Sequence, residues 1–151
     1  MRLKQKNIRI LFLILMFPAM LSAQKDLKIH SIFDKYGKQK GAVMVVLSGK
    51  TLKAYKLDKY RSLSIHYDQV VLSDIQACIE ADKQDAHRIK EVITNGIVSS
   101  GYYQLNNEGD NADTNRYILF KIDSNHKATL IYMEGGLESE ELIEKLFLKQ
   151  K

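Results

Sequence analysis

The chain has 151 residues, of which 45% are hydrophobic, with a single cysteine and a formal net charge of +5. One cysteine excludes an intramolecular disulfide, and this length suits one domain that can bury a core of its own. Four of the five net positive charges lie within the first nine residues, which leaves +1 for residues 24–151. That balance gives no support to a nucleic-acid-binding surface, which would show a basic stripe.

The first 23 residues have the three parts of a secretory signal peptide. Basic residues precede an unbroken apolar run over Ile10–Phe17, and the small residue Ala23 comes before a polar stretch. The apolar run is shorter than the roughly 20 residues of a membrane-spanning helix. We therefore expect cleavage after Ala23, one globular domain over 24–151, a periplasmic or secreted location, and no stable membrane insertion after cleavage. An uncleaved membrane anchor is the alternative.

Patterns in the first half of the domain predict four short elements. Apolar residues at helical spacing, followed by glycine, predict a helix over 26–36. The continuous apolar, β-branched run over 42–47 predicts a buried central strand. One or two helical turns are expected over 51–57, and a short strand over 63–67.

The strongest helical pattern covers residues 74–94. Ser73 and Gln76 have the spacing of a capping box, in which each side chain satisfies the other residue's backbone N–H. Apolar residues then recur on one helical face, and an Asn-Gly pair follows as a typical helix end. Residues 75–81 also alternate between apolar and polar, as a strand would, so a strand over 75–81 remains an alternative.

The last part of the chain predicts three strands and a helix. Strands are expected over 102–105, 117–122 and 129–133, and the short turn-rich links between them predict an antiparallel meander. Ser139 can cap a final helix. Four apolar residues would form the buried face of that helix: Leu142, Ile143, Leu146 and Phe147. The order of elements predicts an α+β fold with a mostly antiparallel sheet of four or five strands and helices packed on one face.

Two loops match ligand-binding motifs only in part. Residues 48–51 read SGKT, but Met44 stands where a phosphate-binding loop needs glycine, so we expect a plain strand-to-helix turn. The loop 106–115 is rich in carboxylate and amide oxygens that suit calcium. However, Arg116 and Ile122 stand where a calcium loop needs glycine and glutamate. Asn, Asp and Gly are turn formers, so a solvated hairpin loop is the stronger interpretation.

Histidine and cysteine form no pattern typical of a metal site or a nucleophile. None of the four histidines has the short spacing of a metal-binding pair: His30, His66, His87 and His126. Cys78 lies one residue before a core position of the predicted helix, which indicates an inert, partly buried thiol. We therefore expect no catalytic residue, no metal site and no cofactor.

Tyrosine is the residue type with an unusual distribution. Four tyrosines fall on the predicted meander: Tyr102, Tyr103, Tyr117 and Tyr132. The adjacent pair Tyr102 and Tyr103 must point to opposite faces of a strand, so one should face outward unless helices cover both faces. Exposed tyrosines suit sugar stacking or protein contacts. These four residues are the candidate binding surface, and cross-strand aromatic packing is the alternative.

Four stretches of the domain carry a likeness to known sequences: 32–37 (IFDKYG), 100–105 (SGYYQL), 116–120 (RYILF) and 130–135 (LIYMEG). Together with the leader, they resemble a group of small exported proteins of unknown function from Bacteroidetes-type bacteria. The resemblance implies an envelope location in a Gram-negative cell. It implies no activity, because the group has none assigned.

These observations together predict an exported, non-catalytic binding or protein-interaction domain. Its expected partner is an envelope protein or a glycan, and not a nucleic acid. The alternative is a small periplasmic enzyme, such as a hydrolase, whose site is assembled only in the fold. That alternative predicts a pocket holding at least two His, Cys or carboxylate groups, at least one of them with a shifted pKa.

Overall fold

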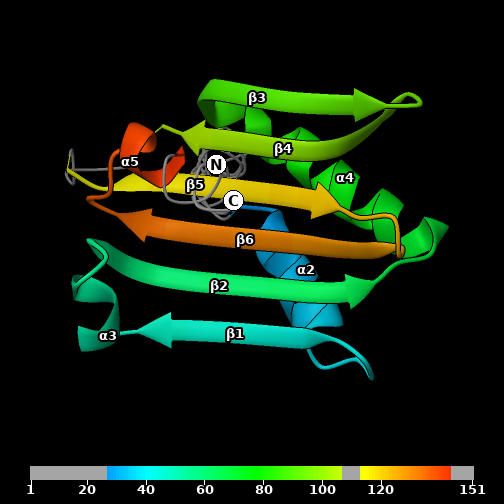
Figure 1. Cartoon of the computed structure of the whole chain (residues 1–151), viewed down its shortest axis with the longest axis horizontal. Coiled ribbons are helices and arrows are strands. Elements are labelled where there is room, and N and C mark those ends of the chain that lie inside the picture. Colours follow the sequence, from blue (N-terminus) through cyan, green and yellow to red (C-terminus); the bar gives the residue numbers. More distant parts are fainter. Residues whose placement is uncertain (1–26, 107–112, 144–151) are drawn as a thin grey trace, which may run out of the picture.

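The computed structural model describes residues 27–106 and 113–143, and its centre is one antiparallel sheet of six strands (Figure 1). The strands lie in the order β1-β2-β6-β5-β4-β3, and every neighbouring pair is antiparallel. The strands are β1 Val43–Ser48, β2 Leu57–His66, β3 Ala86–Thr94, β4 Ile97–Leu105, β5 Asn115–Ile122 and β6 Lys127–Gly135. The α+β class is confirmed, but the sheet has six strands instead of four or five.

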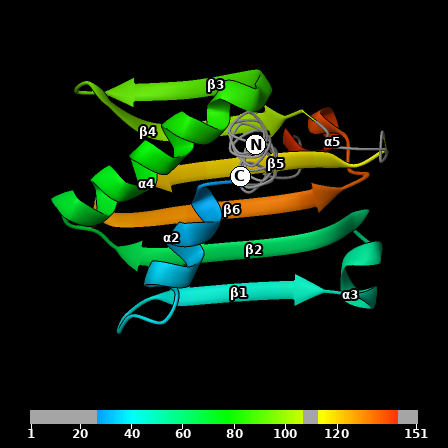
Figure 2. The same cartoon turned by 180° about the vertical axis from the view of Figure 1, so that it is seen from behind.

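Two longer helices cover one face of this sheet, and Figure 2 shows both of them in front of the strands. Shorter helical segments connect or follow the strands. The helices are α2 Ile29–Tyr36, α3 Lys50–Lys53, α4 Gln69–Asp82 and α5 Ser139–Ile143, with a 3-10 turn over Lys83–Asp85 after α4. We call the side that carries α2 and α4 the helix face, and the opposite side the second face.

The main core lies between the helix face and the two longer helices. Both helices present apolar side chains at helical spacing toward the alternate residues of the strands. Phe33 of α2 and Ile75 of α4 are almost fully buried there, against strand residues such as Leu63 and Phe120. Burial of each such side chain stabilises the fold by about 1.5–3 kcal/mol.

A smaller core lies on the second face, at the end of the sheet where α3 and α5 are found. Its central residues are Tyr117 from β5 and Leu52 from α3, with Leu137 from the segment that joins β6 to α5. Strand alternation places Tyr117 and its neighbour Ile118 on opposite faces, so the meander contributes to both cores.

The predicted helix over 74–94 is wrong at both ends. Helix α4 begins after Asp68, whose carboxylate accepts a hydrogen bond from the backbone N–H of Val71 at 2.9 Å. The residues predicted as a capping box therefore lie inside the helix. The helix ends at Asp82, and the residues from 86 to 94 form strand β3. The alternative of a strand over 75–81 is also wrong, because those residues are helical.

The dipeptide Asn95-Gly96 shows why the helix was predicted too long. Both residues have positive φ, 53° for Asn95 and 77° for Gly96, and they join β3 to β4. Two such residues between paired strands form the turn that suits a two-residue hairpin. Asn-Gly serves equally well at a helix end, so the dipeptide alone does not distinguish the two structures.

The other predicted elements agree in kind and differ in length. The meander is confirmed, since β4, β5 and β6 follow one another as antiparallel neighbours. Strands β2 and β4 are longer than the predicted segments 63–67 and 102–105, and the helical stretch predicted over 51–57 is reduced to α3. The predicted cleavage at Ala23 and the core positions at 146 and 147 lie outside the described residues.

Candidate functional site

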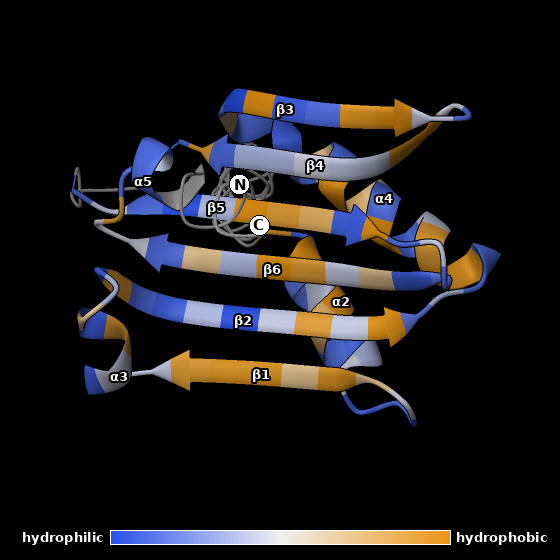
Figure 3. Ribbon diagram, in the orientation of Figure 1, coloured by the Kyte–Doolittle hydropathy of each residue, from blue (hydrophilic) through white to orange (hydrophobic). Residues whose placement is uncertain are grey.

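Strand β1 is a free edge of the sheet, and its side chains are exposed on both faces. No other described strand lies beside it except β2. The exposed fraction is 59% for Val43 and 57% for Val46, and Val45 and Leu47 are exposed as well. Figure 3 shows β1 as a continuous hydrophobic strand at one side of the sheet. The expectation of a buried central strand over 42–47 is therefore wrong.

The second face beside β1 carries no charged side chain on the neighbouring strand positions. Val43, Val45 and Leu47 are alternate residues of β1, so they share the face that α2 and α4 do not cover. Their partners across β2 are uncharged as well: Ser64, Ser62 and Tyr60. On the next strand, β6, the partly buried Ile131 lies opposite Ser62. The free edge is thus apolar on this face, and the two serines of β2 separate it from the smaller core.

Lysines stand at both ends of this strand. Lys38 and Lys40 precede β1, and Lys50 and Lys53 follow it in α3. All four are exposed, and none of them forms an ion pair with another described residue. The free edge is therefore apolar along its length and positively charged at each end.

The opposite edge of the sheet has a different character. Strand β3 also exposes large aliphatic side chains, namely Ile89, Val92 and Ile93. Unlike β1, it carries charged residues within its length, and its Arg88 and Lys90 are exposed. Charged side chains on an edge strand oppose pairing with another chain. The two edges thus differ in charge, and β1 is the edge strand without a charged residue.

All four tyrosines of the predicted binding surface are buried. The exposed fraction is 3% for Tyr102, 0% for Tyr103 and Tyr117, and 2% for Tyr132. Tyr103 and Tyr132 lie in the core on the helix face, and Tyr102 and Tyr117 in the smaller core on the second face. The expectation that one of the adjacent pair faces outward is wrong, because both faces are covered at this end of the sheet.

Tyr102 and Tyr117 hold the C-terminal segment against the second face. The hydroxyl of Tyr102 lies 2.5 Å from that of Ser139, the first residue of α5. The hydroxyl of Tyr117 donates to the carbonyl of Leu137 at 2.6 Å, and the two tyrosine rings are 6.0 Å apart. Burial raises the pKa of both phenols. Their arrangement is that of cross-strand aromatic packing, which was the alternative interpretation.

A cavity of about 310 Å³ lies between α4 and the β3–β4 hairpin. Its polar lining includes Glu80, Glu91 and Tyr103, and the hydroxyl of Tyr103 donates to Glu91 at 2.8 Å. Lys83 lies 2.6 Å from Glu80 and 3.2 Å from Glu91. Its hydrogen bond to Glu80 is the main reason that the pKa of Lys83 is raised.

The contents of this cavity bear on the enzyme alternative. Two carboxylates line it, as that alternative requires, but both are ion-paired with the same lysine. No histidine or cysteine is among the described residues that line it. Nucleophilic catalysis needs a nucleophile within hydrogen-bond reach of a base. The hydroxyl of Tyr103 meets that distance to Glu91, but Tyr103 is fully buried and burial raises the pKa of its phenol, which disfavours the phenolate form.

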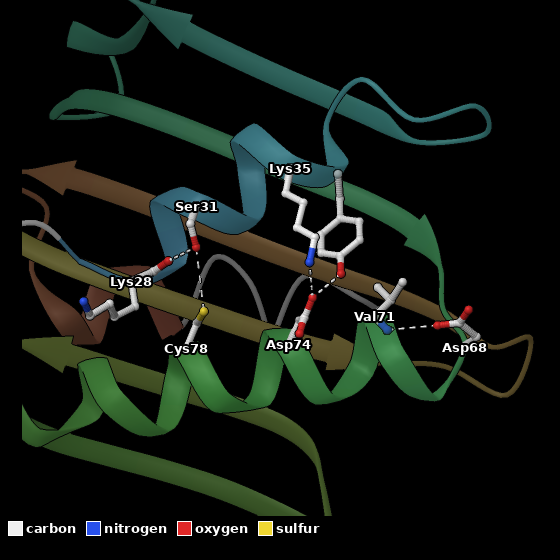
Figure 4. A network of polar contacts seen from close by, with 8 residues as sticks. Lys28, Ser31, Lys35, Asp68, Val71, Asp74 and Cys78 are labelled. Atoms are coloured by element: carbon white, nitrogen blue, oxygen red, sulfur yellow. Dashed lines mark hydrogen bonds and ion pairs between the residues drawn. The ribbon is translucent and has the colours of Figure 1, made fainter.

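Cys78 and one buried tyrosine take part in the contacts between α2 and α4 (Figure 4). The sulfur of Cys78 lies 3.9 Å from the Ser31 hydroxyl, and burial raises the pKa of its thiol. One turn away, Asp74 pairs with Lys35 at 2.7 Å and accepts a hydrogen bond from the Tyr36 hydroxyl. Hydrogen bonds from Lys35 and Tyr36 hold the pKa of Asp74 below its ordinary value. These groups join two helices, and a protonated thiol is a poor nucleophile.

The histidines are dispersed over the fold. His30 meets the Tyr132 ring edge-on at 4.8 Å, and His126 stacks on Tyr67 at 5.7 Å. Among the described residues, no three or more His, Cys, Asp or Glu side chains are grouped so that they could hold a metal ion. The calcium interpretation falls largely on 107–112, outside the described residues. The SGKT stretch is a strand-to-helix turn between β1 and α3, as predicted.

The structure thus defines a small α+β domain with a six-stranded antiparallel sheet, a covered helix face and one apolar free edge. The chain belongs to a family of unknown function (DUF6108), whose family model matches residues 16–146. The expected likeness to proteins of unknown function is confirmed at this level. A comparison with curated proteins gave no match. No helix in the described ranges is both long and apolar enough to cross a bilayer.

Sequence reasoning missed the edge position of β1 because a continuous apolar run is an ambiguous signal. A continuous apolar run is typical of a strand buried on both faces, and residues 43–47 have that pattern. The lysines on either side of the run do not resolve the ambiguity, because the central strands β5 and β6 also have charged residues near their ends, such as Arg116 and Lys127.

Proposed function

We propose that this protein is a non-catalytic interaction domain that acts after export and binds a protein partner along β1. The observation that carries the proposal is the exposure of four large aliphatic side chains on an uncharged edge strand. The described part of the chain buries 24 hydrophobic residues elsewhere. An apolar patch left bare on such a domain is typical of an interaction site.

Strand addition is the mode of binding that this geometry favours. An extended segment of the partner would pair with the free backbone groups of β1 and become a seventh strand. Main-chain hydrogen bonds then supply affinity, and contacts with alternate side chains supply selectivity. Val43, Val45 and Leu47 would provide those contacts on the second face.

A protein suits this surface better than a glycan. Sugar binding commonly relies on exposed aromatic rings for stacking, and the four tyrosines of the meander are buried. Aliphatic side chains beside unpaired N–H and C=O groups instead match the two faces and the backbone of a peptide strand.

Export rests on the first 23 residues. Their basic start, apolar run and small residues before Gln24 support a cleaved signal peptide and a periplasmic or secreted location. The partner would then be another protein of the cell envelope or its surroundings.

Site-specific photo-crosslinking in intact cells tests the proposal. A photoreactive amino acid replaces Val45 on β1, or Val70 as the control, an exposed valine on α4 with an exposed fraction of 66%. We expect a discrete adduct with another envelope protein from position 45 and none from position 70. Equal labelling from both positions, or no adduct from either, would contradict a binding role for β1.

A further inference from the structure

We infer that the segment that pairs with β1 is an extended apolar strand with acidic residues at both of its ends. This inference rests on the proposed function and adds the chemistry of the partner to it. It follows from the distribution of charge: lysines lie on both sides of β1, and the strand itself has no charged residue.

The positive charges lie at the two ends of the strand. Lys38 and Lys40 lie before it, and Lys50 and Lys53 after it, without ion-pair partners among the described residues. A six-residue strand spans about 20 Å at roughly 3.4 Å per residue. That length exceeds the screening length of about 8 Å at physiological salt, so each end attracts an acidic group independently.

Carboxylates near this side of the sheet are mostly occupied by other cations. Asp34 pairs with Arg61 at 3.4 Å and Glu134 with Lys59 at 3.5 Å. Glu141 lies 3.1 Å from Lys56. The neighbouring strand β2 carries two cations, Lys59 and Arg61, and one carboxylate, the exposed Asp58. The surroundings of β1 therefore keep a positive excess that an acidic partner would neutralise.

The same lysines disfavour a second copy of this chain as the occupant. In an antiparallel pair related by a two-fold axis, the start of one β1 lies beside the end of the other. Lys40 would then approach Lys50 of the second copy at both ends of the pair. Like charges placed opposite each other destabilise strand pairing, whereas acidic flanks would stabilise it.

Peptide display with two matched libraries tests this inference. Both libraries carry a random six-residue core, flanked on each side by two glutamates in one library and by two lysines in the other. Each is selected on the purified protein and on two charge-reversed variants. Lys40→Glu/Lys50→Glu changes the ends of β1, and Lys90→Glu/Lys121→Glu changes exposed lysines on β3 and β5 as the control.

We expect the glutamate-flanked library to be enriched at least tenfold over the lysine-flanked one on the unaltered protein. The enrichment should fall as salt is raised. It should be lost for Lys40→Glu/Lys50→Glu, which leaves one lysine and one glutamate at each end of β1, and remain for Lys90→Glu/Lys121→Glu. Circular dichroism of each variant shows that its fold is unchanged.

A third variant separates the two proposals. Val43→Ser/Val45→Ser/Leu47→Ser removes exposed apolar side chains and leaves the charges in place. If neither library is enriched on the unaltered protein relative to this variant, strand addition at β1 fails. If both libraries are enriched equally, strand addition stands and the acidic partner is refuted. A dimer that sedimentation detects at micromolar concentration, and that this variant abolishes, would assign the edge to a second copy and overturn the inference.

Discussion

The carboxylate of Asp82 joins the end of α4 to the start of α2, and its removal should destabilise the fold measurably. Its two oxygens accept hydrogen bonds from the backbone N–H groups of Lys28 at 2.7 Å and Ile29 at 2.9 Å. N–H groups at the start of a helix have no partner within the helix, so the carboxylate supplies what the helix lacks. The residue is 6% exposed although its side chain is a carboxyl group.

The size of the effect follows from these contacts. Asp82→Ala leaves two donors without an acceptor, and each unpaired buried donor costs about 1–3 kcal/mol. Burial of the carboxylate itself raises its pKa, so removing that charge offsets part of the loss. We expect the free energy of unfolding at neutral pH to fall by about 1–3 kcal/mol. Asp85→Ala, in the 3-10 turn that follows, is the control and should stay within about 0.5 kcal/mol.

Urea unfolding monitored by far-ultraviolet circular dichroism measures both variants. For a domain of this size, the slope is about 1–3 kcal/mol per molar urea, so the midpoint for Asp82→Ala should fall clearly below that of the control. A raised pKa means that the pH-dependent part of the contribution of Asp82 is fully present below the ordinary Asp pKa and is lost as pH rises through the raised value. The difference in unfolding free energy between wild type and Asp82→Ala should therefore become smaller over that range, down to the value expected at neutral pH. Equal midpoints for the two alanine variants would refute this account.

Four further outcomes are expected. Gly101→Ala should destabilise the protein by about 1–3 kcal/mol in urea unfolding, because a Cβ there would lie 2.6 Å from a ring carbon of Tyr103; unchanged stability would show that the ring can move aside. Tyr117→Phe should cost about 1–2 kcal/mol in thermal unfolding, since it removes the buried hydrogen bond to Leu137. Burial raises the pKa of all four tyrosines of the meander. The stability that depends on their neutral phenols is therefore fully present below about pH 10 and is lost as pH rises further. Unfolding followed by circular dichroism should coincide with ionisation of these phenols followed by absorbance at 295 nm, and ionisation without unfolding would contradict this. N-terminal sequencing of protein from cells should begin at Gln24, and a start at the first methionine would contradict cleavage of the leader.

Several elements could be predicted because their signals are local. The meander strands are rich in β-branched and aromatic residues, and segments of turn-forming polar residues separate them. The helical spacing of Ile29, Ile32 and Phe33 likewise indicates α2. These patterns depend only on neighbours in the chain, so the α+β class followed from them.

Other features depended on residues far away in the chain. The Asn95-Gly96 turn belongs to a hairpin because β3 pairs with β4, and β4 pairs in turn with the more distant strand β5. The tyrosine pair at 102 and 103 is buried on both faces because α4 covers one face and the segment around Leu137 covers the other. The sequence around those tyrosines gives no indication that α4 or the segment around Leu137 covers them.

For this protein, the sequence by itself determined most of the strands and helices, though not strand β3, together with the charge balance of the domain and the pattern of an export signal. Only the tertiary structure decided that the apolar run over residues 42–47 lies at a free edge and that the four tyrosines of the meander are buried. The physical reason is that hydropathy and periodicity belong to each segment, whereas burial is fixed by the neighbours that the folded chain brings to it.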